Sequence, residues 1–128
     1  MKNDKTWLIM AKEQFDAQGL GGADFYYLIE TMLDSGKMSF PQLVVDAANG
    51  HGCTVREGLG YVLDQDWEPS TLFDEVSFFI GEMEGPGLSI GEFVALVQVA
   101  SEAYCASFPT DADALKRNVE KLIHRYQR

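Results

Sequence analysis

The stretch Glu75-Val-Ser-Phe-Phe-Ile-Gly-Glu-Met-Glu-Gly-Pro-Gly-Leu-Ser-Ile90 decides the class of fold, because the hydrophobic periodicity of the chain changes there. Val76, Phe78 and Ile80 alternate within an aromatic and β-branched run, which is typical of a β-strand. The glycines and the proline that follow predict a turn, and residues 88–90 can return as a short partner strand. A two-stranded hairpin alone is barely stable in water, so it must pack on helices or gain a third strand. That strand can come from residues 54–72 or from a binding partner.

Apolar residues at helical spacing precede this stretch. They predict a helix over about residues 5–18, a second helix after Gly21-Gly22 and a short third helix through residues 43–48. Glycine is the residue that most often ends a helix, and each of the three predicted helices ends at one. These three glycines are Gly19, Gly36 and Gly50. Residues 55–63 predict a weaker helix, because two glycines interrupt it.

Two clear helical patterns follow the stretch, and Phe108-Pro109 separates them. Helix starts are indicated by a capping box, in which a hydroxyl residue is followed three residues later by Glu or Gln. Three segments fit that box: Ser39 to Gln42, Thr54 to Glu57 and Ser89 to Glu92. The last of them places the start of a helix directly after the predicted hairpin.

These patterns together predict an α+β fold that is predominantly helical. It has N-terminal helices, a small antiparallel β-hairpin or sheet near residues 75–90, and two C-terminal helices. The 128 residues are too few for two ordinary domains and enough for one hydrophobic core. A hydrophobic fraction of 46% excludes an acidic disordered tail. No low-complexity linker divides the chain, so we expect a single globular domain over residues 1–128.

Acidic charge is distributed unevenly along the chain. The whole sequence has 10 basic and 20 acidic residues, a net charge of −10. Residues 57–115 contain twelve acids and no Lys or Arg, whereas residues 116–128 carry a net charge of +4. So few basic residues argue against binding nucleic acid through its phosphates. The acids of residues 57–115 must face water, the basic final helix or a basic partner.

The sequence lacks the motifs of the common catalytic and membrane-bound classes. It has no GxSxG, P-loop or GxGxxG pattern. The apolar run at residues 7–10 is too short for a signal peptide, and no stretch approaches the roughly 20 apolar residues of a membrane helix. Cys53 and Cys105 lie far apart and are expected to be reduced thiols. We therefore expect a cytoplasmic protein that is not an enzyme and uses no cofactor.

Two patterns could suggest a metal site, and neither is complete. Pro69 stands where the sharp turn of a calcium loop requires Gly, so this segment is interpreted as a solvated acidic loop. Its acids match the first, third, fifth and twelfth loop positions, at Asp64, Asp66, Glu68 and Glu75. His51 and Cys53 could supply two zinc ligands, whereas a structural zinc site needs four. The sequence therefore predicts no bound metal.

An ordered series of short motifs runs through the C-terminal half. It consists of Leu72-Phe-Asp-Glu-Val-Ser-Phe78, an acidic hairpin, Leu88-Ser-Ile-Gly-Glu-Phe93, and Ala100-Ser-Glu-Ala-Tyr104 followed by Phe108-Pro109. This series resembles the immunity proteins that neutralise ribonuclease toxins in bacterial contact-dependent growth inhibition. In that family a Phe-Asp-Gly-Val-like strand leads to an acidic turn, a Glu-Glu-Phe helix, an Ala-Cys-Glu-x-Tyr helix end, a proline and a last helix.

The resemblance covers about residues 72–127 and departs from the family pattern at three positions. Glu75 replaces the glycine, Gly91 replaces the first glutamate, and Ser101 stands where cysteine is common. What the resemblance implies is the class of partner, a cognate toxin nuclease. It implies no individual binding residue in this chain.

The first functional hypothesis is an immunity protein that covers the basic cleft of a toxin nuclease with an acidic surface, in a 1:1 complex without nucleic acid or membrane. The acids expected to steer this encounter are Asp64, Asp66, Glu68, Asp74, Glu75, Glu82 and Glu84. Trp67 lies inside a polar turn, and it either anchors the partner or fills the edge of the core. An acidic adaptor of another basic protein is the alternative, and a small enzyme is a third.

Overall fold

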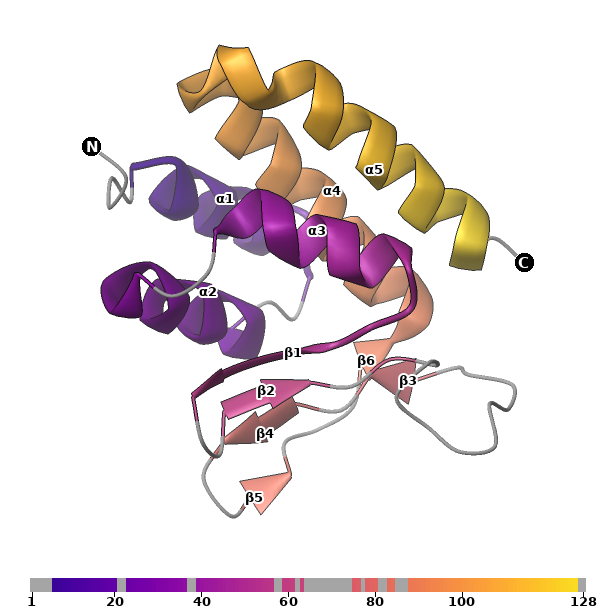
Figure 1. Cartoon of the computed structure of the whole chain (residues 1–128). Coiled ribbons are helices and arrows are strands. Elements are labelled where there is room, and N and C mark those ends of the chain that lie inside the picture. The colour runs from indigo at the N-terminus through magenta and orange to yellow at the C-terminus, as the bar shows by residue number, and fades with distance from the viewer. Residues whose placement is uncertain are drawn as a thin grey trace.

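The computed structural model describes residues 6–20, 23–36, 39–56, 59–61, 63, 75–76, 78–80, 83–84 and 88–126. The described elements are α1 (Thr6–Ala17), α2 (Ala23–Ser35), α3 (Phe40–Ala48), β1 (Cys53–Arg56), β2 (Leu59–Tyr61), β3 (Glu75–Val76), β4 (Phe78–Ile80), β5 (Met83–Glu84), β6 (Leu88–Ser89), α4 (Ile90–Ser107), the 3₁₀ turn η2 (Pro109–Asp111) and α5 (Ala112–Tyr126). Figure 1 shows the helices grouped on one side of small antiparallel sheets. The predicted α+β, predominantly helical class is therefore confirmed.

The three N-terminal helices end where their glycines predict. Gly19, Gly36 and Gly50 have φ angles of +70°, +68° and +85°, a region that only glycine enters without strain. The N-cap hydroxyls were also predicted correctly at two sites. Ser39 Oγ accepts from the Gln42 amide at 3.3 Å, and Ser89 Oγ accepts from the Glu92 amide at 3.1 Å. Local sequence therefore determines these helix ends.

Residues 53–56 and 59–61 form two strands, so the weak helix predicted over 55–63 and the capping box at Thr54 were wrong. β1 pairs antiparallel with β2, and Thr54 lies opposite Gly60. The register shifts between Thr54 and Arg56, which marks a bulge. Glycines weaken a helix, and Gly60 also lets the backbone of β1 approach closely. Gly60, one of the two glycines that interrupted the predicted helix, thus belongs to a strand.

The third strand for the predicted hairpin comes from the chain itself. A four-stranded sheet has the order β1-β2-β4-β5, and β2 pairs with β4 through Gly60 and Phe79. The sequence suggested that residues 88–90 pair with the strand around Phe78. In the structure β6 does not pair with β4. It pairs with β3 in a separate two-stranded sheet, with Glu75 opposite Ser89. Residues 75–90 therefore divide between two sheets.

One aromatic group joins the helices to the sheet. Phe25 of α2 lies 5.9 Å from the ring of Phe93 in α4 and 6.4 Å from that of Phe78 in β4. The Tyr61 ring of β2 lies 5.1 Å from Phe93 and 5.3 Å from Phe78. All four side chains are buried. The hydrophobic core is therefore continuous from the helical layer into the sheet.

The longest helix, α4, occupies the middle of the helical layer. Its buried side includes Phe93, Leu96, Val97 and Ala100, as the apolar spacing predicts. It packs against α1 on one side and against α5 on another, and α5 also packs on α3 (Figure 1). Both cysteines are free thiols, as expected. The arrangement leaves one side of α4 and α5 open to solvent.

Candidate functional site

Most of the acidic surface predicted from the sequence lies outside the described residues. This holds for Asp64, Asp66, Trp67, Glu68, Asp74 and Glu82. Glu75 lies in β3, opposite Ser89 at the start of α4. Glu84 lies in β5, the last strand of the four-stranded sheet, opposite Phe79. The structure thus places two of the predicted residues by their backbone, in two different sheets.

Three basic residues of α5 are exposed and form no ion pair with the acids that the structure describes. Lys116, Arg117 and Lys121 are exposed, and within the described ranges none of them makes an ion pair. The same is true of four exposed acids from residues 57–115, namely Glu92, Glu102, Asp111 and Asp113. α5 packs on α3 and α4, away from the four-stranded sheet in the view of Figure 1. These opposite charges therefore remain available to partners.

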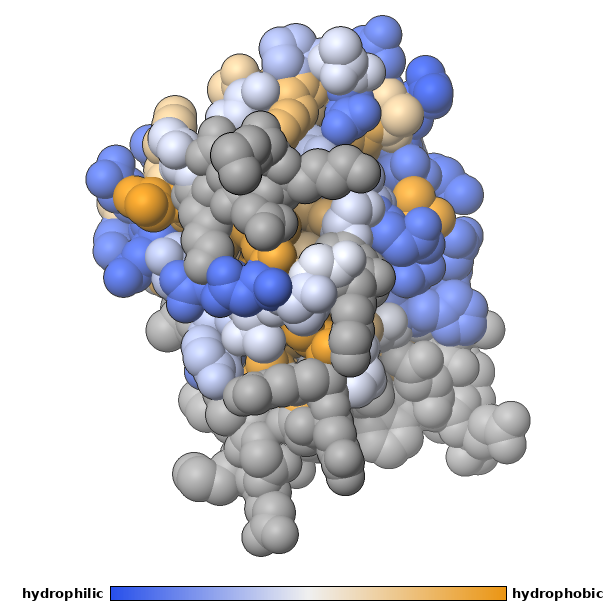
Figure 2. All heavy atoms as spheres, turned by 60° about the vertical axis from the view of Figure 1, so that its left-hand side comes forward, coloured by the Kyte–Doolittle hydropathy of each residue, from blue (hydrophilic) through white to orange (hydrophobic). Residues whose placement is uncertain are grey.

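Exposed hydrophobic side chains are few on the helical layer. Ile9 and Met10 of α1 are 52% and 46% exposed, and Tyr27 of α2 is 38% exposed. Figure 2 shows that the hydrophobic atoms visible on its face are scattered among hydrophilic ones. A few exposed apolar residues of this kind are normal on a protein surface. This face therefore offers no broad apolar docking patch among the residues described.

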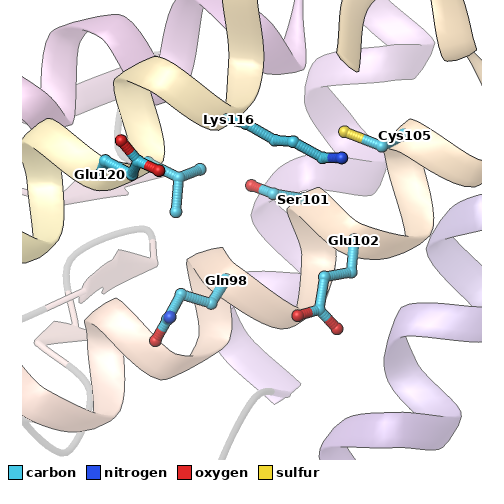
Figure 3. Close-up of a pocket in the computed structure, with 7 residues that line it drawn as sticks. Gln98, Ser101, Glu102, Cys105, Lys116 and Glu120 are labelled. Carbon is cyan, nitrogen blue, oxygen red and sulfur yellow. The ribbon is translucent and has the colours of Figure 1, made fainter. Parts of the chain in front are cut away.

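A pocket of about 210 Å³ opens between α4 and α5. Its lining residues are Gln98, Ser101, Glu102 and Cys105 from α4, and Lys116, Val119 and Glu120 from α5. On each helix these residues are spaced three or four apart, so they share one face. Figure 3 shows the side chain of Lys116 extending from α5 toward α4. The pocket thus combines a cation, two carboxylates, an amide, a hydroxyl and a thiol.

Ser101 is the unusual member of this pocket. It is only 5% exposed, and its Oγ has no hydrogen-bond partner. A buried hydroxyl without a partner costs about 1–3 kcal/mol. The sequence offered one signal for it, a serine within the apolar stripe of α4, although nothing there showed that its hydroxyl would lack a partner.

Cys105 lies one helical turn beyond Ser101. Burial raises the pKa of the Cys105 thiol, and the charge of Lys116 opposes part of that shift. The thiol is therefore mainly protonated at neutral pH and is a poor nucleophile. In this pocket it can serve as a weak hydrogen-bond donor.

Tyr104, which precedes Cys105 in the sequence, makes a contact between α4 and η2. Tyr104 donates its phenol hydrogen bond to Asp111 Oδ2 at 3.0 Å, and its ring lies 4.6 Å from Phe108 and 5.2 Å from Trp7. Burial, followed by the hydrogen bond to Asp111, raises the pKa of Tyr104 to about 12. This contact fixes the turn that leads into α5.

The raised pKa of Tyr104 predicts that stability falls in alkaline solution. Its ordinary pKa is 10.0, so between about pH 10 and 12 the unfolded chain loses a proton that the folded chain keeps. The free energy of unfolding therefore decreases as pH rises through this window. Cys53 acts in the same direction from pH 9, because burial raises the pKa of its thiol from 9.0 to about 11.

Tyr104→Phe tests this pH dependence. We expect the variant to lose roughly 1 kcal/mol at neutral pH through the missing hydrogen bond. Its free energy of unfolding should then decline less steeply than that of the wild type between about pH 10 and 12. Urea denaturation across the alkaline range measures both effects. Parallel curves for the two proteins would contradict the assignment to Tyr104.

The described residues offer neither a cluster of metal ligands nor a membrane-spanning helix. No three His, Cys, Asp or Glu side chains in that part of the chain gather as a metal site requires. The calcium-loop pattern at Asp64 to Glu75 lies almost wholly outside the described residues. None of the helices described has the length and apolar character needed to cross a membrane.

Comparison with known proteins gives no relative from which a function could be carried over. No family model matches the chain, and no curated protein or solved structure matches it either.

Proposed function

We propose that this chain is an immunity protein that binds and inhibits a cognate toxin nuclease, most simply a ribonuclease, in the cytoplasm. It acts by occupying the basic substrate cleft of the nuclease in a 1:1 complex, without catalysis or a cofactor. The proposal rests on the short motifs shared with immunity proteins over residues 72–127 and on the charge distribution of the chain.

The observation that carries the proposal is an acidic block that contains no basic residue of its own. Residues 57–115 contain twelve acids and no Lys or Arg. Three bases of α5 could have cancelled part of that charge, yet Lys116, Arg117 and Lys121 make no ion pair in the part of the chain described. A nuclease must attract a polyanion, so its cleft is basic. A surface of opposite sign accelerates the encounter with such a cleft.

The steering charges of this proposal are Asp64, Asp66, Glu68, Asp74, Glu75, Glu82 and Glu84. Steering alone gives fast association and does not slow release. An inhibitor therefore also needs a desolvated contact at the centre of the interface. Trp67, flanked by these acids in the sequence, is the side chain proposed for that role.

Co-expression with the protein encoded immediately upstream tests the proposal, because the genes of a toxin and its immunity protein are expected to be adjacent. The expected result is a complex of equal stoichiometry in which nuclease activity is lost. A stable complex that keeps its nuclease activity would instead support the acidic adaptor. Absence of a complex when both chains are folded would reject the proposed function.

A further inference from the structure

We propose that the pocket between α4 and α5 binds a small zwitterion of the α-amino-acid class. The pocket lies on the helical layer, and this proposal does not depend on the toxin-binding function. Its volume of about 210 Å³ is below the roughly 300 Å³ at which sites for drug-sized ligands begin, so a metabolite of amino-acid size is the appropriate scale.

Two donors define the end of the pocket that would take a carboxylate. Ser101 Oγ is buried without a hydrogen-bond partner, and in Figure 3 it points from α4 toward α5. The side chain of Lys116 extends past Ser101, and its amine end lies beside Cys105, whose pKa its charge lowers. A carboxylate between them would accept one hydrogen bond from a hydroxyl and another from an ammonium group.

Either of two acceptors could take an ammonium group, since Glu120 and Glu102 lie on opposite sides of Ser101 in Figure 3. Glu102 of α4 and Glu120 of α5 both line the pocket, and neither makes an ion pair within the described ranges. Lys116 and Glu120 are one helical turn apart, a spacing that favours a salt bridge, yet they do not form one. Each charge is therefore left for a ligand. Gln98 adds an amide that can donate or accept.

Charge balance separates a zwitterion from simpler ligands. Lys116, Glu102 and Glu120 sum to one negative charge, so a simple anion would increase the repulsion within the pocket. A simple cation would satisfy the carboxylates and leave the Ser101 hydroxyl and the Lys116 ammonium without an acceptor. A zwitterion binds both the donors and the carboxylates. An aliphatic side chain on that ligand would contact Val119 and the methylene groups around it.

Isothermal titration of the full chain with the common L-amino acids tests the proposal. The tightest of them is then compared with its deaminated acid and its decarboxylated amine, each of which lacks one charge. Both analogues are expected to bind at least about tenfold more weakly, because each loses a hydrogen bond to a charged group. An acid analogue that binds equally well would reject the zwitterion in favour of a simple anion site.

Two variants locate the binding in this pocket. Ser101→Ala removes an unsatisfied hydroxyl, and the variant is expected to fold. Its affinity for the amino acid should be about tenfold lower than that of the wild type. Lys116→Met is expected to have an effect of similar size. Lys121→Met removes an exposed charge from the same helix outside the pocket, and it should bind as the wild type does. Undetectable binding at roughly 10 mM ligand, or equal affinity in Ser101→Ala and wild type, would overturn the proposal.

Discussion

Removing four negative charges from the acidic block is expected to slow association with the toxin nuclease at least about tenfold at low salt. The variant carries Asp64→Asn, Asp66→Asn, Asp74→Asn and Glu75→Gln. Its amide side chains are close in size to the originals, so the change is mainly electrostatic. Stopped-flow association across a salt series measures the effect. The salt dependence of the rate should become shallower as well, because fewer charges remain to be screened.

A matched control removes the same number of charges from the helical layer. Glu13→Gln, Asp16→Asn, Asp24→Asn and Glu30→Gln lie in α1 and α2 and change the net charge by the same amount. If the position of the charge matters, this control should associate at nearly the rate of the wild type. Equal slowing in both variants would mean that net charge alone drives the encounter. An unchanged rate in the first variant would remove the steering role.

Gly60→Ala is expected to destabilise the fold by about 2–3 kcal/mol. A Cβ atom at residue 60 would overlap the Cys53 carbonyl oxygen and lie 2.9 Å from Thr54 Cα. Both obstacles are backbone atoms of β1, so the strands themselves must move apart. That movement would also displace Tyr61, whose ring packs on Phe78 and Phe93. Urea denaturation measures the loss.

Gly91→Ala provides the comparison for this prediction. Gly91 lies in the first turn of α4, where an added Cβ would meet no atom closer than Ser89 Oγ at 4.0 Å. Alanine favours a helix over glycine, so the variant should be neutral or more stable by up to about 1 kcal/mol. Similar losses of stability in the two variants would contradict the argument from close strand approach.

Features that depend on neighbouring residues were predictable from the sequence. Gly19, Gly36 and Gly50 mark helix ends because their backbone conformation is nearly specific to glycine. Ser39 and Ser89 mark helix starts because a hydroxyl can satisfy a free amide three residues later. Each of these interactions lies within one turn of chain.

Features that depend on distant segments were not predictable. β2 was expected to be part of a weak helix, because Phe79, the strand partner of Gly60, lies far along the chain and local sequence does not reveal that pairing. The pocket at Ser101 was missed for a related reason. Whether that hydroxyl has a partner depends on how α5 lies across α4, and local sequence does not specify such a packing.

The pairing of N-terminal helices with C-terminal ones affects folding during synthesis. α1 packs on α4 and α3 packs on α5, so two helices of the N-terminal half are covered by helices that are synthesised after them. Trp7 and Phe40 share their aromatic contacts with Tyr104, near the end of α4. Until α4 leaves the ribosome, these apolar faces have no lasting cover, and closing so long a loop slows folding. Chaperones that bind exposed apolar surface would therefore have access to α1 and α3 until α4 and α5 are synthesised.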